Sequence, residues 1–208
     1  MLLGPNSART TLPMAFGISD TARKAAEGGG KGGGFLGVSK LGDGESYRVA
    51  IVSDDPFESW TVWGESGDKK KPFRFTSEPS AADIEAELGD YTQRMSYDGD
   101  KLESPKFSLA FFVFDYSDSQ IKVFEIPQKT LIKEIDKLSK DEDYQNLHEW
   151  DLKFSRAGLK LDTVYSILPS PRKAGSQKLI DATWKVAQDQ GADITALLVG
   201  GNPFGEKL

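Results

Sequence analysis

The 208-residue chain contains no cysteine and a single histidine, His148. Disulfides and thiolate metal sites are therefore excluded, and one imidazole cannot build a histidine cluster. The chain also lacks the run of about 18 to 20 apolar residues that a membrane-spanning helix requires. Its start, MLLGPNSARTTLPMAFG, has no basic stretch followed by a long apolar block, as an export signal would. These absences predict a soluble, unexported protein in a reducing compartment, with no metal and no cofactor.

The formal net charge of −6 argues at first against a polyanionic partner, because acidic proteins are repelled by phosphates at long range. The charges are segregated along the chain, however. Residues 1–40 carry five cations and two carboxylates, whereas residues 76–104 carry eight carboxylates and two cations. The net charge thus averages over basic and acidic segments, and their placement in the fold decides which partner can approach.

Composition divides the chain into three regions. Residues 1–34 end in GGGKGGG and are expected to form a flexible, glycine-rich leader. Residues 35–173 alternate β-rich runs with turn residues and contain the acidic insertion at about 76–104, with a short helix at 81–88. Residues 174–208 are expected to form a C-terminal helix and tail.

The middle region reads as a series of strands with one helix. Strands are expected at 47–53, 59–63, 72–75, 108–116, 121–126, 150–156 and 162–168. Pro127 suits the first position of a helix whose apolar residues recur at i, i+4 and i+7. The absence of βα alternation favours a mainly β fold, a small closed barrel with the helix between its late strands.

Catalytic motifs are absent from the sequence, which contains no G-x-S-x-G, no H-E-x-x-H and no calcium loop. The best enzymatic alternative is a metal-dependent nuclease, in which carboxylates bind Mg²⁺ and a lysine orients the attacking water. Its candidate residues are Asp54, Asp55, Glu149, Asp151 and Lys153. The run Asp54-Asp55-Pro56 is equally a turn, so the sequence favours a protein that is not an enzyme.

Rings and cations concentrate in residues 57–75, FESWTVWGESGDKKKPFRF, and in the hairpin that follows the acidic insertion. Successive side chains of a strand face opposite sides, so Trp60 and Trp63 are expected to separate, and alternation favours Trp63 as the exposed one. Exposed rings beside cations suit single-stranded nucleic acid, because bases stack on rings and cations follow phosphates. The candidate DNA-binding residues are Trp60, Trp63, Lys69, Lys70, Lys71, Phe73, Arg74, Phe75, Lys106, Phe112, Tyr116, Lys122 and Phe124.

A competing interpretation of these residues is structural. Most aromatics in the strands would then pack in the core, and the three lysines would form a solvated hairpin tip. A further alternative is a protein-interaction module on the same barrel, in which the rings form the hot spot of an interface with a host or phage protein.

The order of the motifs resembles a group of bacteriophage single-stranded DNA-binding proteins with an oligonucleotide/oligosaccharide-binding (OB) fold. The likeness covers residues 35–173 and is most specific from FEIPQKTLIKEIDKL to LDTVYSILPSP. It implies a five-stranded OB-fold barrel that coats DNA strands during phage replication, recombination or repair, in the cytoplasm of the infected bacterial host. The matching positions are Trp60, Trp63, Arg74, Phe75, Lys106, Phe112, Tyr116, Lys122 and Phe124.

Two features depart from that group. Some members of the wider group carry a structural zinc, for which this chain has no ligands. Many single-strand binders also end in a strongly acidic tail, whereas this chain ends in NPFGEKL. The expected partner is single-stranded DNA, and a phage replication or recombination protein that contacts the C-terminal tail is a further candidate.

Overall fold

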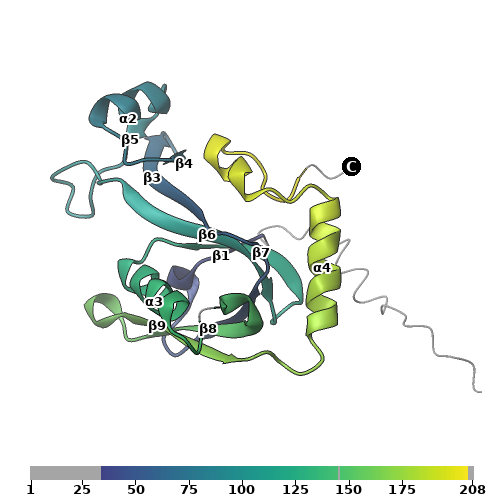
Figure 1. The fold of residues 1–208 in the computed structure, drawn as a ribbon. Coiled ribbons are helices and arrows are strands. Elements are labelled where there is room, and N and C mark those ends of the chain that lie inside the picture. Colours follow the sequence, from purple (N-terminus) through teal and green to yellow (C-terminus); the bar gives the residue numbers. More distant parts are fainter. Residues whose placement is uncertain (1–33, 145, 206–208) are drawn as a thin grey trace, which may run out of the picture. The chain divides into compact units, whose positions relative to one another are not determined.

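A computed structural model describes residues 34–144 and 146–205, which are mainly β (Figure 1). The expectation of a mainly β fold is confirmed. The leader, apart from Gly34, and the last three residues of the tail lie outside the described residues. No helix in the described part is long and apolar enough to cross a membrane.

The strands form a sheet in the order β1-β7-β6-β2-β8-β9, and β3 pairs with β6 and carries β4 and β5. Their bounds are β1 Phe35–Leu36, β2 Ser46–Ile51, β3 Phe57–Ser66, β4 Lys69–Phe75, β5 Thr92–Gln93, β6 Lys106–Asp115, β7 Gln120–Ile126, β8 Trp150–Ala157 and β9 Val164–Pro171. Strand β1 pairs with β7 in parallel, and β9 pairs with β8. The sheet is not closed, so the expected closed five-stranded barrel is not confirmed.

Strand β6 has different partners along its length. Its first half pairs with β3, from Lys106 opposite Thr61 onward, and its second half pairs with β2. The chain turns between β2 and β3, where the backbone N–H of Phe112 donates to Ser53 Oγ at 3.1 Å. The SDDP turn that the sequence predicts therefore lets two consecutive strands pair with one long strand.

The helices have the bounds α2 Ala81–Leu88, α3 Lys129–Lys140 and α4 Gln177–Asp189, and the 3₁₀ segments are η1 Val38–Lys40, η2 Leu147–Glu149, η3 Lys160–Asp162 and η4 Ile194–Val199. Helix α2 begins with a capping box, in which Ser80 and Asp83 each accept a backbone N–H of the other. The N-cap of α3 is Gln128, so Pro127 precedes the helix instead of occupying its first position.

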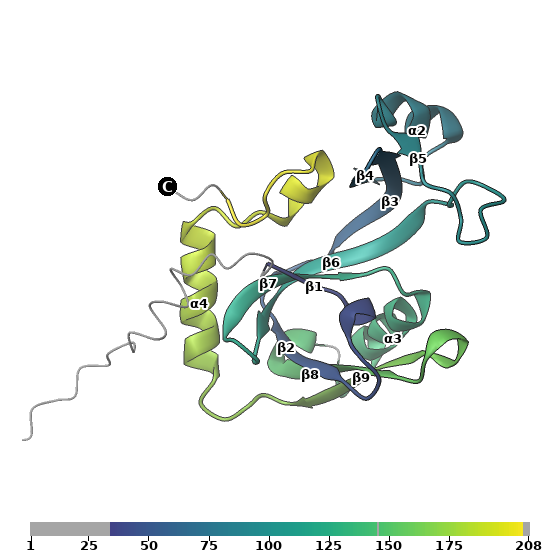
Figure 2. The same ribbon diagram turned by 180° about the vertical axis from the view of Figure 1, so that it is seen from behind.

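Side chains of a strand alternate between its two faces, and in β6 both faces are buried. Phe111 and its odd-numbered neighbours pack with α3 and with Phe154 of β8. Phe112 and its even-numbered neighbours pack with Trp184 of α4. Figures 1 and 2 show α4 beside the β6–β7 hairpin, on the side away from α3. A third, smaller cluster lies under α2 and contains Phe73.

Phe154→Ala is expected to lower the free energy of unfolding by about 3–5 kcal/mol, because it opens a cavity in the core that α3 covers. The Phe154 ring is fully buried, with its centroid 4.6 Å from that of Phe124. The matched control is Val164→Ala on β9. Val164 is 63% exposed, so its replacement should lower the free energy of unfolding by less than about 0.5 kcal/mol. Urea denaturation measures both changes, and equal losses would contradict this description of the core.

Candidate nucleic-acid interface

A groove of about 660 Å³ lies over the sheet where β3, β4 and β6 meet the segment around β1 and η1. We call it the basic groove. Five cations line it, namely Lys40, Lys71, Arg74, Arg94 and Lys106, together with the rings of Phe35 and Trp63 and one carboxylate, Glu125. Residues 197, 200 and 201, in and after η4, also line it.

The alternation of strands explains how the sequence assembles the basic groove. Thr61 and Trp63 share one face of β3, and Arg74 of β4 and Lys106 of β6 lie directly opposite Thr61 on its two sides. Trp60 belongs to the other face, where its ring meets that of Phe107 at 5.6 Å between centroids. The structure therefore places Trp63, and not Trp60, in the basic groove.

Arg94 holds Trp63 in position from the acidic insertion. Its guanidinium carbon lies 5.5 Å from the centre of the Trp63 ring, and its backbone N–H donates to the Trp63 carbonyl at 2.8 Å. Arg94 Nε also donates to Glu103 at 2.6 Å, and Lys106 donates to the same carboxylate. Burial alone would raise the pKa of Glu103, but hydrogen bonds from Lys106 and Arg94 outweigh it and lower that pKa. Glu103 thus stays ionised and ties two groove cations together.

The floor of the basic groove holds buried polar atoms without partners. Arg74 Nη2 donates to Glu125 at 3.0 Å, and Ser108 Oγ donates to the other oxygen of that carboxylate at 3.2 Å. The Arg74 side chain is only 8% exposed, yet its Nε finds no acceptor among the described residues, and neither does the Thr61 hydroxyl find a partner there. Buried polar atoms are normally satisfied, so unpaired ones at a groove are typical of a site that binds water or a ligand.

Phe112 and Phe124 correct the sequence interpretation. Both rings were expected on the ligand-facing side, but they are 2% and 0% exposed and lie in the two main cores. Phe73 is also buried, beneath α2, and Phe75 is half-buried against the same cluster. None of these four rings lines the basic groove. The structural interpretation of the aromatics holds for them because the sheet is covered on both faces.

Lys122 and Tyr116 form bonds to carboxylates of the protein. Lys122 is buried and pairs with Asp115 at 2.7 Å and Asp118 at 2.6 Å. Burial would lower the pKa of Lys122, but its hydrogen bonds to the two carboxylates outweigh this and raise it. The Tyr116 hydroxyl donates to Asp151 at 2.8 Å. Neither residue lines the basic groove.

The lysine run lies within strand β4 and not at the hairpin tip, which is formed by the residues around Gly67. Lys71 lines the basic groove, with its Nζ 4.6 Å from the centre of the Phe73 ring. Lys70 pairs with Glu65 at 3.3 Å, and Lys69 is exposed. One lysine of the three therefore belongs to the site.

The nuclease residues are not assembled into a centre. Asp151 is fully buried and accepts hydrogen bonds from Arg48 at 2.7 Å and from Tyr116. Asp54 and Asp55 lie in the exposed turn before β3. Within residues 34–144 and 146–205, no group of three or more acidic or histidine side chains is placed to hold a metal ion. Asp151 has a structural role, because these bonds join β8 to β2 and to the residue that follows β6.

Sequence reasoning missed Phe35, Lys40 and Arg94, which are three of the eight lining residues that carry a charge or a ring. Phe35 and Lys40 come from the start of the middle region, where no strand was expected, and β1 reaches the sheet only through its pairing with β7. Arg94 is one of two cations in an acidic segment. No local pattern marks any of them, since long-range pairing brings them together.

Thr61→Val is expected to raise the free energy of unfolding by about 0.5–1 kcal/mol, because it removes a buried hydroxyl that lacks a partner. Ser108→Ala on the neighbouring strand should instead lower it by about 0.5–2 kcal/mol, because that hydroxyl donates to Glu125. Urea denaturation distinguishes the two. A loss in Thr61→Val as large as that in Ser108→Ala would show that the Thr61 hydroxyl is satisfied in the free protein.

The basic groove thus combines the rings of Phe35 and Trp63 with five cations and with buried polar atoms that have no partner among the described residues. Bases can stack on rings, phosphates can pair with cations, and base or sugar groups can reach polar atoms. Comparisons of the chain with family models, with curated proteins and with solved structures found no match.

Proposed function

We propose that this protein binds single-stranded DNA in the basic groove, with little sequence preference, and protects it during phage DNA replication, recombination or repair. The observation that carries the proposal is the meeting of five cations with Phe35 and Trp63 in one groove. Cations provide sequence-independent attraction to phosphates, and rings accept any base. In that role the protein would act in the cytoplasm of the infected bacterial host.

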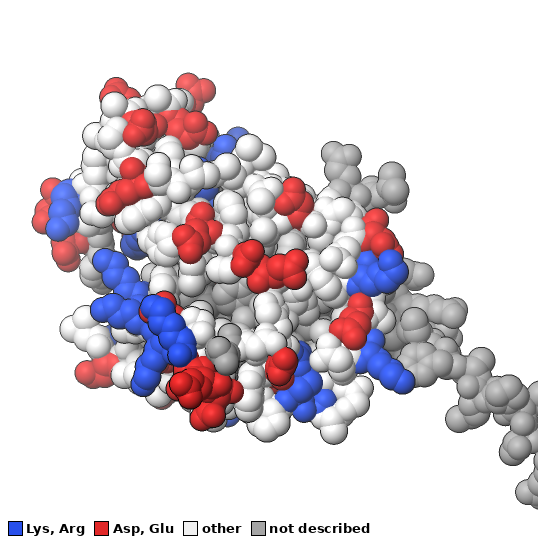
Figure 3. All heavy atoms as spheres, in the orientation of Figure 1, with Lys and Arg blue, Asp and Glu red and all other residues white. Residues whose placement is uncertain are grey.

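The net charge of −6 does not oppose this proposal, because the carboxylates lie mainly elsewhere. Figure 3 shows acidic side chains gathered over α2, at the upper left of the view. Within the part of the chain that the structure describes, no ion pair involves Lys40 or Lys71. These two lysines are therefore free to pair with phosphates. Salt screens the attraction only weakly once a phosphate comes closer to the lysine than about 8–10 Å, the screening length in ordinary salt.

The strand pairing supports an OB-type fold as the finer description. Strands β2 and β3 together act as one bent strand, followed by the β6–β7 hairpin, helix α3 and the β8–β9 hairpin. An OB fold is a five-stranded, partly open barrel that binds oligonucleotides on its second and third strands and adjoining loops. In such a fold β6 and β7 would be the second and third strands, and both contribute residues to the basic groove beside the β3–β4 hairpin.

Trp63→Ala is expected to weaken binding of oligo-dT about 5- to 100-fold, because one base loses its stacking partner. Lys71→Ala should weaken binding and reduce the dependence of log affinity on log salt by about 0.7, the value for one phosphate of a single strand. The control Lys178→Ala removes an exposed lysine of α4 and should change neither quantity. Fluorescence anisotropy with labelled oligo-dT at several salt concentrations measures all three.

A duplex of the same length is the second control, because its bases are not available for stacking. Equal affinity for duplex and oligo-dT would contradict the proposed function. So would unchanged affinity in Trp63→Ala, since binding would then occur away from the basic groove.

A further inference from the structure

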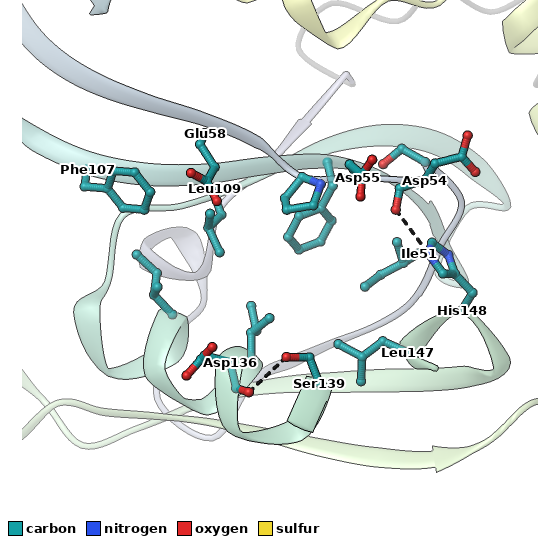
Figure 4. A pocket seen from close by; sticks show the side chains of 15 residues that line it. Ile51, Asp54, Asp55, Glu58, Phe107, Leu109, Asp136, Ser139, Leu147 and His148 are labelled. Atoms are coloured by element: carbon teal, nitrogen blue, oxygen red, sulfur yellow. Dashed lines mark hydrogen bonds between the residues drawn. The ribbon is translucent and has the colours of Figure 1, made fainter. Parts of the chain in front are cut away.

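A second cavity, of about 470 Å³, opens on the opposite face of β6 (Figure 4). It lies between the turn that joins β2 to β3 and helix α3, and it shares no lining residue with the basic groove. We call it the acidic cavity. Its floor is apolar and consists of Ile51, Phe107, Leu109, Phe111, Ile132, Ile135 and Leu147. Four of these side chains, Ile51, Phe107, Ile132 and Ile135, are only half-buried, so apolar surface remains open to a ligand.

The rim of the acidic cavity carries four carboxylates, those of Asp54, Asp55, Glu58 and Asp136, and no lysine or arginine lines it. Asp136 pairs with Lys140 at 2.7 Å. The other three rim carboxylates take part in no ion pair within the described residues. The acidic cavity therefore combines an apolar floor with a negatively charged rim, and that rim repels nucleic acid.

The backbone holds the rim in place. The Ser53 hydroxyl accepts a hydrogen bond from the backbone N–H of Phe112 at 3.1 Å. The backbone N–H of Val52 donates to the carbonyl of Phe112, also at 3.1 Å. On the other side, His148 Nε2 lies 3.2 Å from the Asp54 carbonyl oxygen. These contacts fix the acidic turn against the core strand β6 and against η2. The acidic cavity is therefore formed before any ligand binds, as small binding sites commonly are.

Metal binding does not account for the acidic rim, because no three of its carboxylates are grouped to hold an ion in the described part of the chain. The half-buried isoleucines do not favour a small polar ligand either. A ligand that satisfies both features has an apolar side chain for the floor and cations for the rim.

We propose that the acidic cavity binds a short basic segment of a partner protein, which inserts one or two apolar side chains between α3 and the β2–β3 turn. A basic partner is chosen for its charge. Cationic residues on either side of the inserted apolar side chain would pair with Asp54, Asp55 and Glu58. The site lies on the face of β6 opposite the basic groove and shares no lining residue with it, so a partner bound there leaves the basic groove open. The inference does not depend on the proposed function.

The test uses the full chain and a fluorescein-labelled peptide in which a Leu-Phe pair is flanked on each side by two lysines. Two matched peptides replace the lysines by glutamates or the Leu-Phe pair by Gly-Ser. We expect the basic, apolar peptide to bind with a dissociation constant below about 1 mM, and both matched peptides to bind at least about tenfold more weakly.

Variants of the chain locate the binding. Asp55→Lys reverses one exposed rim charge and should weaken the peptide about three- to tenfold, and Ile135→Asp should weaken it further by placing a carboxylate in the floor. The control Glu87→Lys makes the same charge change on exposed α2 and should have no effect. Circular dichroism checks that each variant is folded, and Asp55→Lys keeps the test decisive if Ile135→Asp does not fold.

Affinity for oligo-dT, measured in the same variants, separates this inference from the proposed function, because Asp55→Lys should leave DNA binding within about twofold. Absence of peptide binding at about 1 mM would overturn the inference. Equal binding by Asp55→Lys and the unmodified chain would also overturn it, as would equal binding of the glutamate peptide. Self-association of the chain that Asp55→Lys abolishes would show that a second copy is the occupant, against the proposal.

Discussion

The split pairing of strand β6 is the constraint on which both sites depend. Its first half is bound to β3 and its second half to β2, so one strand joins the hairpin that bears Trp63 to the strands that build the core. Because side chains alternate along it, the even-numbered face continues into the basic groove and the odd-numbered face forms the floor of the acidic cavity. The turn after Ser53 makes this possible.

Charge is sorted by the same arrangement. Cations from η1, β4, β6 and the residue after β5 meet on one side of the sheet, while carboxylates of the β2–β3 turn, the start of β3 and α3 meet on the other. A chain with a net charge of −6 can therefore present a basic surface to one ligand and an acidic surface to another. Ion pairs such as those of Glu103 with Arg94 and Lys106 hold groove cations in place, but they also reduce the charge available to phosphates.

Local patterns predicted most of the elements. The helix at 81–88 has the expected bounds, and the β6–β7 hairpin lies where two β-rich runs flank a polar turn. Sequence reasoning failed where long-range packing decides. Phe112 and Phe124 look like surplus rings in a single hairpin, but α4 and α3 cover the two faces of the sheet and bury them. Arg94 joins the basic groove only because β5 pairs with β3, which no local pattern of the acidic insertion indicates.

Photochemical crosslinking can locate bound DNA on the protein. Oligo-dT that contains 5-iododeoxyuridine can be crosslinked to the full chain by light, and mass spectrometry then identifies the attached residue. Crosslinks are expected at Trp63 and Phe35, the two rings of the basic groove. Crosslinks confined to Trp60, or to rings near the acidic cavity such as Phe107, would contradict it.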